Sequence, residues 1–287
     1  MQILVTEKST DYELVDSGNG EKLERYGAYV LRRPDPQVLW EKTLLNEWDN
    51  ADAVYERSGV SGKWKKNKEI DASWSVNINN ISFSVELLPS KHLGVFPEQS
   101  PNWNWLEEKI KKENGREVSV LNLFGYTGGA TIACSRAGAK VCHVDSSKFA
   151  VDLAHKNLNE SGLSENPVRF IVEDVRKFVE REINRGNKYD VVIMDPPVYG
   201  KGVKKEVWKI EDDLLPLLKK IKKILSNDPV AILVNGYSSI YSSTTYKEAL
   251  KSLMADFKGE TESGELTLKE SSSGRLLTEG IFARWSK

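Results

Sequence analysis

The segment from residue 120 to residue 145 most constrains how this chain can fold. An apolar run over residues 120–123 leads into a glycine-rich turn, a helix of small residues follows, and a second apolar run ends in Asp145. This order predicts a strand–turn–helix–strand unit whose glycines let backbone N–H groups approach a ligand closely. Asp145 then lies beside the turn, where its carboxylate can accept two hydrogen bonds from a ribose diol. The unit therefore predicts a site for a nucleoside cofactor.

The spacing of the glycines argues against a dinucleotide. Dinucleotide sites use G-x-G-x-x-G, whereas Gly125, Gly128 and Gly129 give G-x-x-G-G. No G-K-[ST] sequence closes the turn, so it is not a P-loop either. An uncharged, wider turn suits a cofactor without phosphate, such as S-adenosylmethionine, and we expect this cofactor to bind and NAD not to bind. By itself, the glycine cluster is equally consistent with an ordinary strand–helix turn.

Polar residues follow two further apolar runs. Residues 168–172 are followed by Glu173 and Asp174, and residues 191–194 are followed by Asp195. The polar groups therefore stand at the carboxyl ends of successive predicted parallel strands, which is where open α/β sheets bind ligands. This order favours a methyltransferase site over an isolated turn.

Two prolines follow Asp195 directly. Pro196 and Pro197 fix φ and lack N–H donors, so their carbonyls are left to accept hydrogen bonds. Rigidly placed carbonyl acceptors can bind an amino group or position a nucleophile beside a methyl donor. A lone Asp-Pro-Pro step is more often a turn that ends a strand, and here its place after the other segments favours methyl transfer.

These segments together make the chain similar to class I S-adenosylmethionine-dependent methyltransferases. More narrowly, it resembles the family of large-subunit ribosomal RNA cytosine-C5 methyltransferases. The narrower resemblance rests on a lead-in over residues 91–99, on residues 102–103, on residues 123–128 and on a closing run over residues 280–285. It covers about residues 89–287. It implies an α/β fold with a seven-stranded Rossmann-like sheet and a lead-in that folds over the cofactor.

The resemblance also implies which residues bind the cofactor. Asp145 would bind the ribose, Asp174 the adenine amino group and Val175 the adenine ring. The methionine and ribose side would be lined by Phe96, Gln99, Asn122, Phe124, Tyr126, Thr127 and Gly128. The predicted set is completed by Asn102, Gly125, Ser146 and Asp195.

One departure from that family concerns cysteine. Cytosine-C5 enzymes attack the base with a cysteine thiolate, and the family carries Ser-Cys-Ser after the fifth strand. This chain has residues 235–239, Asn-Gly-Tyr-Ser-Ser, at that place. Its two cysteines, Cys134 in a predicted helix and Cys142 in a predicted strand, are typical small core residues. The sequence therefore predicts a reaction without a cysteine nucleophile, and reduced core cysteines indicate the cytoplasm.

The methyl acceptor stays open at this point. Base N-methyltransferases place an aromatic residue directly after the prolines, whereas here Val198 comes first and Tyr199 second. Tyr199 can stack on an acceptor or pack on the sheet edge, and a hydroxyl acceptor with Asp195 as base is a third option. Four residues are predicted to act on the acceptor, namely Asp195, Pro196, Pro197 and Tyr199. The predicted substrate contacts are Tyr199, Lys201, Lys204 and Lys205.

The chain's charge sets limits on its partners. Its net charge is −1 and its pI is about 6.4, so it is not a generic nucleic-acid binder, although a local basic patch can suffice. The leading hypothesis is a methyltransferase acting on ribosomal or transfer RNA. A small-molecule methyltransferase and a non-catalytic S-adenosylmethionine-binding protein are the alternatives. No metal is expected, and the oligomeric state is open between monomer and dimer.

The N-terminal part differs in pattern from the rest. Residues 1–88 hold short strand-like runs separated by turn residues, which predicts a small antiparallel β domain. This domain could present the acceptor or cover the sheet, and residues 89–287 would form the methyltransferase domain. The RNA-binding PUA module of the ribosomal RNA enzymes is not recognisable. No apolar run of eighteen residues predicts a membrane span, and no signal peptide is expected.

Overall fold

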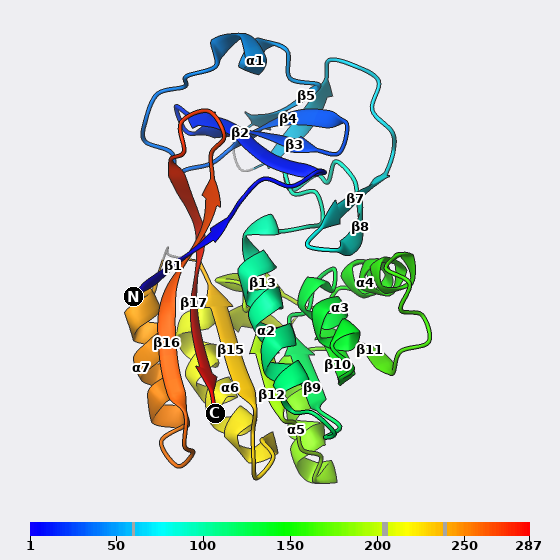
Figure 1. Ribbon diagram of the computed structural model, residues 1–287, viewed down its shortest axis with the longest axis vertical. Helices are drawn as coiled ribbons and strands as arrows, with labels where there is room; N and C mark the ends of the chain where they lie inside the picture. The colour runs from blue at the N-terminus through cyan, green and yellow to red at the C-terminus, as the bar shows by residue number, and fades with distance from the viewer. Residues whose placement is uncertain (59–60, 203–205, 238–239) are drawn as a thin grey trace. The chain divides into compact units, whose positions relative to one another are not determined.

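The computed structural model describes residues 1–58, 61–202, 206–237 and 240–287, which form two compact units (Figure 1). Unit 1 comprises Met1–Leu4, Pro101–Glu265 and Gly280–Lys287. Unit 2 comprises Val5–Ser100 and Leu266–Glu279. Both units are therefore built from separate stretches of chain. A functional boundary at residue 88 stays a prediction.

Unit 1 is built on a mostly parallel sheet with the strand order β1-β16-β17-β15-β12-β9-β10-β11. Strands β15, β12, β9, β10 and β11 are mutually parallel, and β17 pairs antiparallel with β15. This confirms the α/β methyltransferase-like fold class. The strands are β1 (Gln2–Thr6), β9 (Ser119–Leu123), β10 (Lys140–Asp145), β11 (Val168–Val172), β12 (Val191–Met194), β15 (Ala231–Gly236), β16 (Glu260–Lys269) and β17 (Leu276–Ser286).

The sheet has one strand more than the seven that the sequence predicted. Strand β1 lies beside β16 at the sheet edge. The Gln2 side chain donates a 2.6 Å hydrogen bond to Glu262. A Cβ atom at Gly264 would lie 1.9 Å from the Gln2 carbonyl oxygen, so only glycine allows this approach. The pairing joins residues about 260 positions apart, which a local pattern does not disclose.

Six helices cover the sheet of unit 1 among its described residues. Side chains cap three of them at the N-terminus: Ser147, Asp174 and Ser242 accept hydrogen bonds from backbone N–H groups in the first turn. A short hairpin joins β13 (Tyr199–Lys201) to β14 (Val207–Lys209). The helices are α2 (Ser100–Lys112), α3 (Gly129–Arg136), α4 (Lys148–Glu160), α5 (Val175–Arg185), α6 (Ile210–Ile224) and α7 (Ser243–Leu253).

Alternating strand residues of unit 1 pack against α5, α6 and α7. Leu121 and Leu123 of β9 and Val192 and Met194 of β12 belong to one buried cluster with side chains of these three helices. Because side chains alternate across a strand, the intervening residues face the other side of the sheet. The sheet is thus an inner layer, and the polar groups at its strand ends are held on a rigid support.

Unit 2 holds a five-stranded sheet in the order β2-β3-β4-β5-β6 and a separate hairpin of β7 and β8. It confirms the small β-rich domain, with one difference: β4 and β5 pair in parallel, at Leu31 with Ala53, while the other pairs are antiparallel. Its elements are β2 (Tyr12–Gly18), β3 (Glu21–Tyr26), β4 (Tyr29–Pro34), α1 (Leu45–Asp49), β5 (Ala53–Ser58), β6 (Ser61–Lys66), β7 (Trp74–Ile78), β8 (Ile81–Val85) and the 3-10 helix η1 (Pro97–Gln99).

None of the helices in the described part of the chain is both long and apolar enough to span a membrane.

Candidate active site

The strand register brings the polar segments of unit 1 to one edge of its sheet. Leu123 of β9 pairs with Val144 of β10 and with Met194 of β12. Asp145 pairs with Val172, the last residue of β11. Since all four strands are parallel, their carboxyl ends meet at this edge, as the sequence predicted. The residues that emerge there are Phe124, Asp145, Asp174 and Asp195.

The glycine-rich turn after β9 has an unusual backbone. Phe124, Tyr126 and Gly128 have φ angles of +55°, +45° and +90°. Left-handed backbone is uncommon for residues other than glycine, and it is found where the surrounding structure requires it. The Gly125 N–H donates to the Val144 carbonyl at 3.1 Å, and the Gly128 N–H donates to the Gly125 carbonyl at 3.0 Å. These bonds fix the turn before any ligand is bound.

Two glycines of this turn are also required by packing. A Cβ atom at Gly125 would lie 2.5 Å from the His143 ring, and one at Gly129 would lie 2.4 Å from the Trp103 ring. Real Cβ contacts are not this short, so an alanine would displace a buried ring. The glycine pattern therefore reflects both the ligand site and the core beneath it.

Asp145 holds the turn through its carboxylate. One oxygen accepts the Tyr126 N–H at 3.0 Å, and the other accepts the Ser147 N–H at 2.8 Å. Burial raises the pKa of the Asp145 carboxyl above its ordinary value, against the opposing effect of these backbone donors. The Ser146 backbone N–H also stabilises the carboxylate. The two oxygens have four lone pairs in all, so three backbone donors leave one acceptor site. This acceptor site fits a hydroxyl group of a ribose diol.

The Asp174 carboxylate is fixed by hydrogen bonds to the first turn of helix α5. It caps α5, and its carboxylate binds the Arg176 guanidinium, with the shortest contact at 2.8 Å. Burial raises the pKa of Asp174, but the hydrogen bonds and charge of Arg176 outweigh it and leave the pKa below its ordinary value. One oxygen accepts from Arg176 Nη2 alone, so it keeps a lone pair for an amino group.

Asp195 has a different environment. It follows β12 directly, and burial raises its pKa from an ordinary value of 3.8 to about 7. No residue in the described part of the chain forms a hydrogen bond to its carboxylate. Near neutral pH this carboxyl is divided between its protonated and ionised forms. A group in that state can take up or release a proton during a reaction.

A cavity of about 80 Å³ lies at this edge. The indole N–H of Trp208 closes one side by donating to the Pro197 carbonyl at 2.7 Å, and its ring meets Phe124 edge-on at 4.9 Å. The two proline carbonyls were predicted to be free to accept from a ligand. The Pro197 carbonyl instead accepts from Trp208. Six of the ten residues that line the cavity were predicted site residues: Phe124, Ser146, Asp174, Val175, Pro197 and Lys201.

Comparison with proteins of known structure decides the family. A crystal structure of a SAM-dependent methyltransferase from Agrobacterium tumefaciens is 38% identical, with a TM-score of 0.95 over 100% of this chain and 93% of its own. This chain belongs to the S-adenosylmethionine-dependent methyltransferases. A Streptococcus mutans protein, 20% identical, shares the fold with a TM-score of 0.73 over 96% of this chain and 76% of its own.

The methyltransferase also has relatives known by sequence. A model of the family described as "Conserved hypothetical protein 95" matches residues 99–230. Ribosomal RNA large subunit methyltransferase I from Vibrio campbellii is 32% identical over 161 residues, which are 52% of this chain and 39% of that protein. The enzyme of that name from Aeromonas salmonicida is 32% identical over 186 residues, 61% of this chain and 44% of that protein. The chain thus spans about two fifths of the length of these relatives.

Other predicted cofactor residues of the methyltransferase lie deeper or elsewhere. Asn122 is buried and donates to Thr131 at 2.9 Å, and the Thr127 carbonyl accepts from Asn157 at 2.9 Å. Asn102 is buried in α2 and donates to Asn235 at 3.0 Å. Phe96 and Gln99 belong to unit 2, before and within η1. That all of these bind the cofactor stays a prediction.

The predicted acceptor residues lie on the β13–β14 hairpin. Tyr199 pairs with Lys209 across the hairpin, and its side chain is 52% exposed. About half of its surface is therefore open to a partner, and its role stays a prediction. Lys201 is exposed on the same strand. Lys204 and Lys205 lie outside the described residues.

Sequence reasoning missed the buried polar group under the turn. His143 of β10 contacts Thr131 at 2.9 Å through Nδ1, while its Nε2 has no partner among the described residues. Burial lowers the pKa of His143 to about 4, so the ring is neutral at physiological pH. A histidine within an otherwise apolar strand was the available signal.

Both cysteines are remote from this chemistry. Cys134 is buried in α3 and Cys142 in the middle of β10. Burial raises the pKa of both thiols, that of Cys142 to about 11. Among the described residues no three histidine, cysteine or acidic side chains lie together as a metal site.

The cysteine environments lead to a prediction. Cys134→Ala and Cys142→Ala should each retain turnover in protein that stays folded, and no covalent adduct should form with RNA containing 5-fluorocytosine. Denaturing gel electrophoresis of enzyme and RNA would detect such an adduct. An adduct lost in either variant would show that one of these thiols is the nucleophile.

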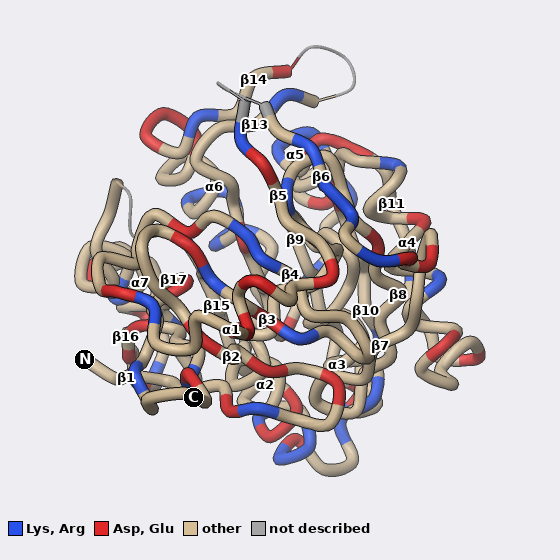
Figure 2. Tube along the Cα trace, turned by 90° about the horizontal axis from the view of Figure 1, so that it is seen from above, with Lys and Arg blue, Asp and Glu red and all other residues tan. Residues whose placement is uncertain are grey.

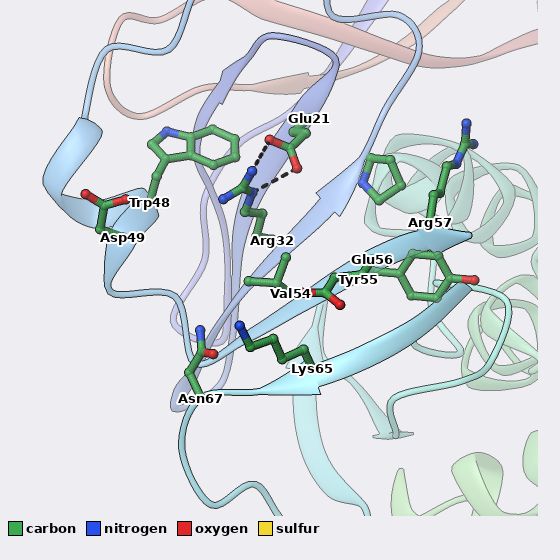
Figure 3. Close-up of a pocket in the computed structure, with 11 residues that line it drawn as sticks. Glu21, Arg32, Trp48, Asp49, Val54, Tyr55, Glu56, Arg57, Lys65 and Asn67 are labelled. Atoms are coloured by element: carbon green, nitrogen blue, oxygen red, sulfur yellow. Dashed lines mark hydrogen bonds and ion pairs between the residues drawn. The ribbon is translucent and has the colours of Figure 1, made fainter. Parts of the chain in front are cut away.

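A second, polar cavity of about 430 Å³ lies within unit 2 (Figure 3). Arg32 within it pairs with Glu21, and Trp48 and Val54 form part of its wall (Figure 3). Three cationic and three acidic residues line it, so its charges balance and indicate no ligand class. Strand β6 carries Lys63, Lys65 and Lys66, and its tube is largely blue in Figure 2. It is an edge strand of its sheet.

Proposed function

We propose that the methyltransferase acts on RNA, either ribosomal or transfer RNA, without a cysteine nucleophile. The observation that carries this proposal is the similarity to ribosomal RNA large subunit methyltransferase I from two organisms, at 32% identity. The matched stretch covers more than half of this chain in both cases. We also propose residues 1–88 and 89–287 as the two functional domains.

Three carboxylates at the sheet edge, those of Asp145, Asp174 and Asp195, would have different roles. The free acceptor site of Asp145 fits a hydroxyl group of the ribose diol of S-adenosylmethionine, and the remaining lone pair of Asp174 fits the adenine amino group. Val175 and Phe124 line the adjoining cavity with apolar surface. When bound, the cofactor supplies a methyl group on a positively charged sulfur.

The acceptor side would use Asp195. Methyl transfer requires the attacking atom in line with the bond from sulfur to methyl, at near-attack distance. Asp195 can orient the attacking atom and accept its proton, because its pKa of about 7 matches neutral conditions. The Pro196 carbonyl can accept from an amine. Tyr199 can stack on a base, which contributes about 1–3 kcal/mol.

The decisive experiment is mass spectrometry of RNA nucleosides from cells with and without the gene. A methylated nucleoside that disappears with the gene, and returns with the wild-type gene but not with Asp195→Ala, would establish the proposal. An unchanged set of nucleosides in ribosomal and transfer RNA would refute it.

A small-molecule acceptor is the second candidate, and the net charge of −1 favours it. RNA-binding proteins gain much of their affinity from cations that neutralise phosphates. The two candidates differ in what the lysines after Asp195 should do.

Replacing Lys201, Lys204 and Lys205 together with glutamine should separate the candidates. If the acceptor is RNA, the slope of log affinity against log salt should fall by about two to three, at roughly 0.7–0.9 for each phosphate that is no longer neutralised. Cofactor affinity should be unchanged, since the carboxylates remain. Binding titrations of RNA at several salt concentrations would measure this.

A matched triple replacement of exposed helix lysines, Lys148, Lys156 and Lys251, is the control and should leave the slope unchanged. Equal slopes in all three proteins, with unimpaired turnover, would favour the small-molecule acceptor.

A further inference from the structure

A cavity of about 410 Å³ lies within unit 1 where its parallel strands begin. Its walls come from the first residues of β9, β10 and β11 and from the chain that enters β12. Strand β10 runs five residue steps from Lys140 to Asp145, which is roughly 17 Å at about 3.3 Å per residue. The cavity is therefore at the opposite end of the strands from the candidate active site.

The floor of this cavity is apolar. Cys142 and Tyr189 line it, and both belong to the same buried cluster of side chains. Its volume lies within the range of small-molecule sites, about 300–1,000 Å³. An apolar floor of this kind suits a planar ring, because burial of apolar surface is favourable and makes no demand for hydrogen bonds.

The rim of the cavity is cationic. Lys140, Arg169 and Lys188 line it, and none of the lining residues is acidic. Lys140 pairs with Glu117 at 2.6 Å. Lys188 donates to the Lys223 backbone carbonyl at 2.7 Å, and no acidic side chain among the described residues pairs with it.

Arg169 is attracted by the charge of Glu182 but forms no direct ion pair with it. Its side chain is exposed on β11 and has no hydrogen-bond or ion-pair partner among the described residues. The acidic group on the floor side is Glu182, which accepts the Tyr189 hydroxyl at 2.7 Å and is buried. A guanidinium and an ammonium beside an apolar floor together fit a ring that carries a phosphate.

We propose that this cavity binds a nucleotide, with its base on the floor of Cys142 and Tyr189 and its phosphate between Arg169 and Lys188. A free mononucleotide and a nucleotide within RNA share this chemistry. The proposal does not rest on the function proposed above, because the cavity shares no residue with the candidate active site.

The test uses the full chain saturated with S-adenosylhomocysteine, so that a nucleotide cannot bind at the cofactor site. Calorimetry with adenosine 5′-monophosphate should show binding, and adenosine without phosphate should bind at least about tenfold more weakly. Arg169→Ala and Lys188→Ala should each weaken binding of the monophosphate by about tenfold. Lys156→Ala, an exposed lysine of α4, is the matched control and should bind normally.

Unchanged affinity for S-adenosylhomocysteine would show that the variants are folded. A second measurement needs no variant: the nucleotide should protect Lys140 and Lys188, but not Lys156, from amine labelling read by mass spectrometry. Absence of binding at millimolar nucleotide, wild-type affinity in both variants or absence of protection would overturn the proposal.

A short oligoribonucleotide would separate the two sources of the ligand. Tighter binding than the monophosphate, with a steeper dependence on salt, would indicate RNA. Weaker binding would indicate a free nucleotide.

Discussion

Asp195→Ala should abolish turnover and weaken cofactor binding far less, because the other predicted cofactor residues remain. A positioned general base contributes about 10²–10⁴-fold to a rate, so a loss in that range is expected. Turnover under saturating cofactor, together with calorimetric binding of S-adenosylhomocysteine, would measure both effects. Asp152→Ala, an exposed carboxylate on α4, is the control and should be fully active. A fully active Asp195→Ala enzyme would show that Asp195 is not the base of the reaction.

The raised pKa of Asp195 predicts how the turnover of the wild-type enzyme depends on pH. The ionised carboxylate is the form that accepts a proton, so wild-type turnover should rise with pH and level off above about 7. Asp195→Asn should lose both the activity and this rise. A wild-type profile without an inflection between about pH 6 and 8 would contradict the role assigned to Asp195.

The free energy of unfolding should fall as the pH rises through the pKa of Asp195, whereas turnover should rise. Since burial raises the pKa of the folded protein from 3.8 to about 7, the folded state binds a proton more tightly than the unfolded state. The stabilising effect of that proton is complete below the unfolded pKa and is lost as pH rises through about 7. Asp195→Asn removes the penalty of the buried charge, so its melting temperature should exceed that of the wild type at pH 8.

Asp145→Ala should weaken cofactor binding by roughly 10- to 100-fold. Hydrogen bonds to a charged group contribute about 1.5–3 kcal/mol each, and each 1.4 kcal/mol is tenfold in affinity. Calorimetry with S-adenosylhomocysteine would measure the loss. Asp145→Asn keeps one carbonyl acceptor but no charge, and it should fall between the wild type and the alanine variant.

The melting temperature separates this effect from damage to the turn. Asp145 accepts hydrogen bonds from the backbone N–H groups of Tyr126, Ser146 and Ser147. Asp145 is partly exposed, so water can replace it and the loss of stability should be small. Undiminished affinity in folded Asp145→Ala would place the ribose elsewhere.

The strand ends were predictable because their signals are local. Apolar runs that end in Asp145, Asp174 and Asp195 predicted the parallel strands and the edge at which they meet, and the register confirms it. The capping roles of Asp174 and Ser147 follow from the same local chemistry. Helix α2 was missed, although buried Trp103, Leu106 and Ile110 recur at spacings of three and four.

Other elements could not be predicted, since their partners are distant in the chain. Strand β1 depends on β16, and the charged strand β3 on its neighbours β2 and β4. The ring of His143 beneath Gly125 and the indole of Trp208 on the Pro197 carbonyl are further long-range contacts.

The sequence by itself determined the fold class, the cofactor and the carboxylates at the strand ends. The spacing of apolar residues, the spacing of glycines and the residue types are properties of short segments, so they can be recognised without the tertiary structure. The tertiary structure alone decided which acceptor atoms remain open, how strongly burial raises the pKa of Asp195, and that Tyr199 is exposed. Those properties depend on what surrounds each group in space, and solvent exclusion by residues far along the chain sets them.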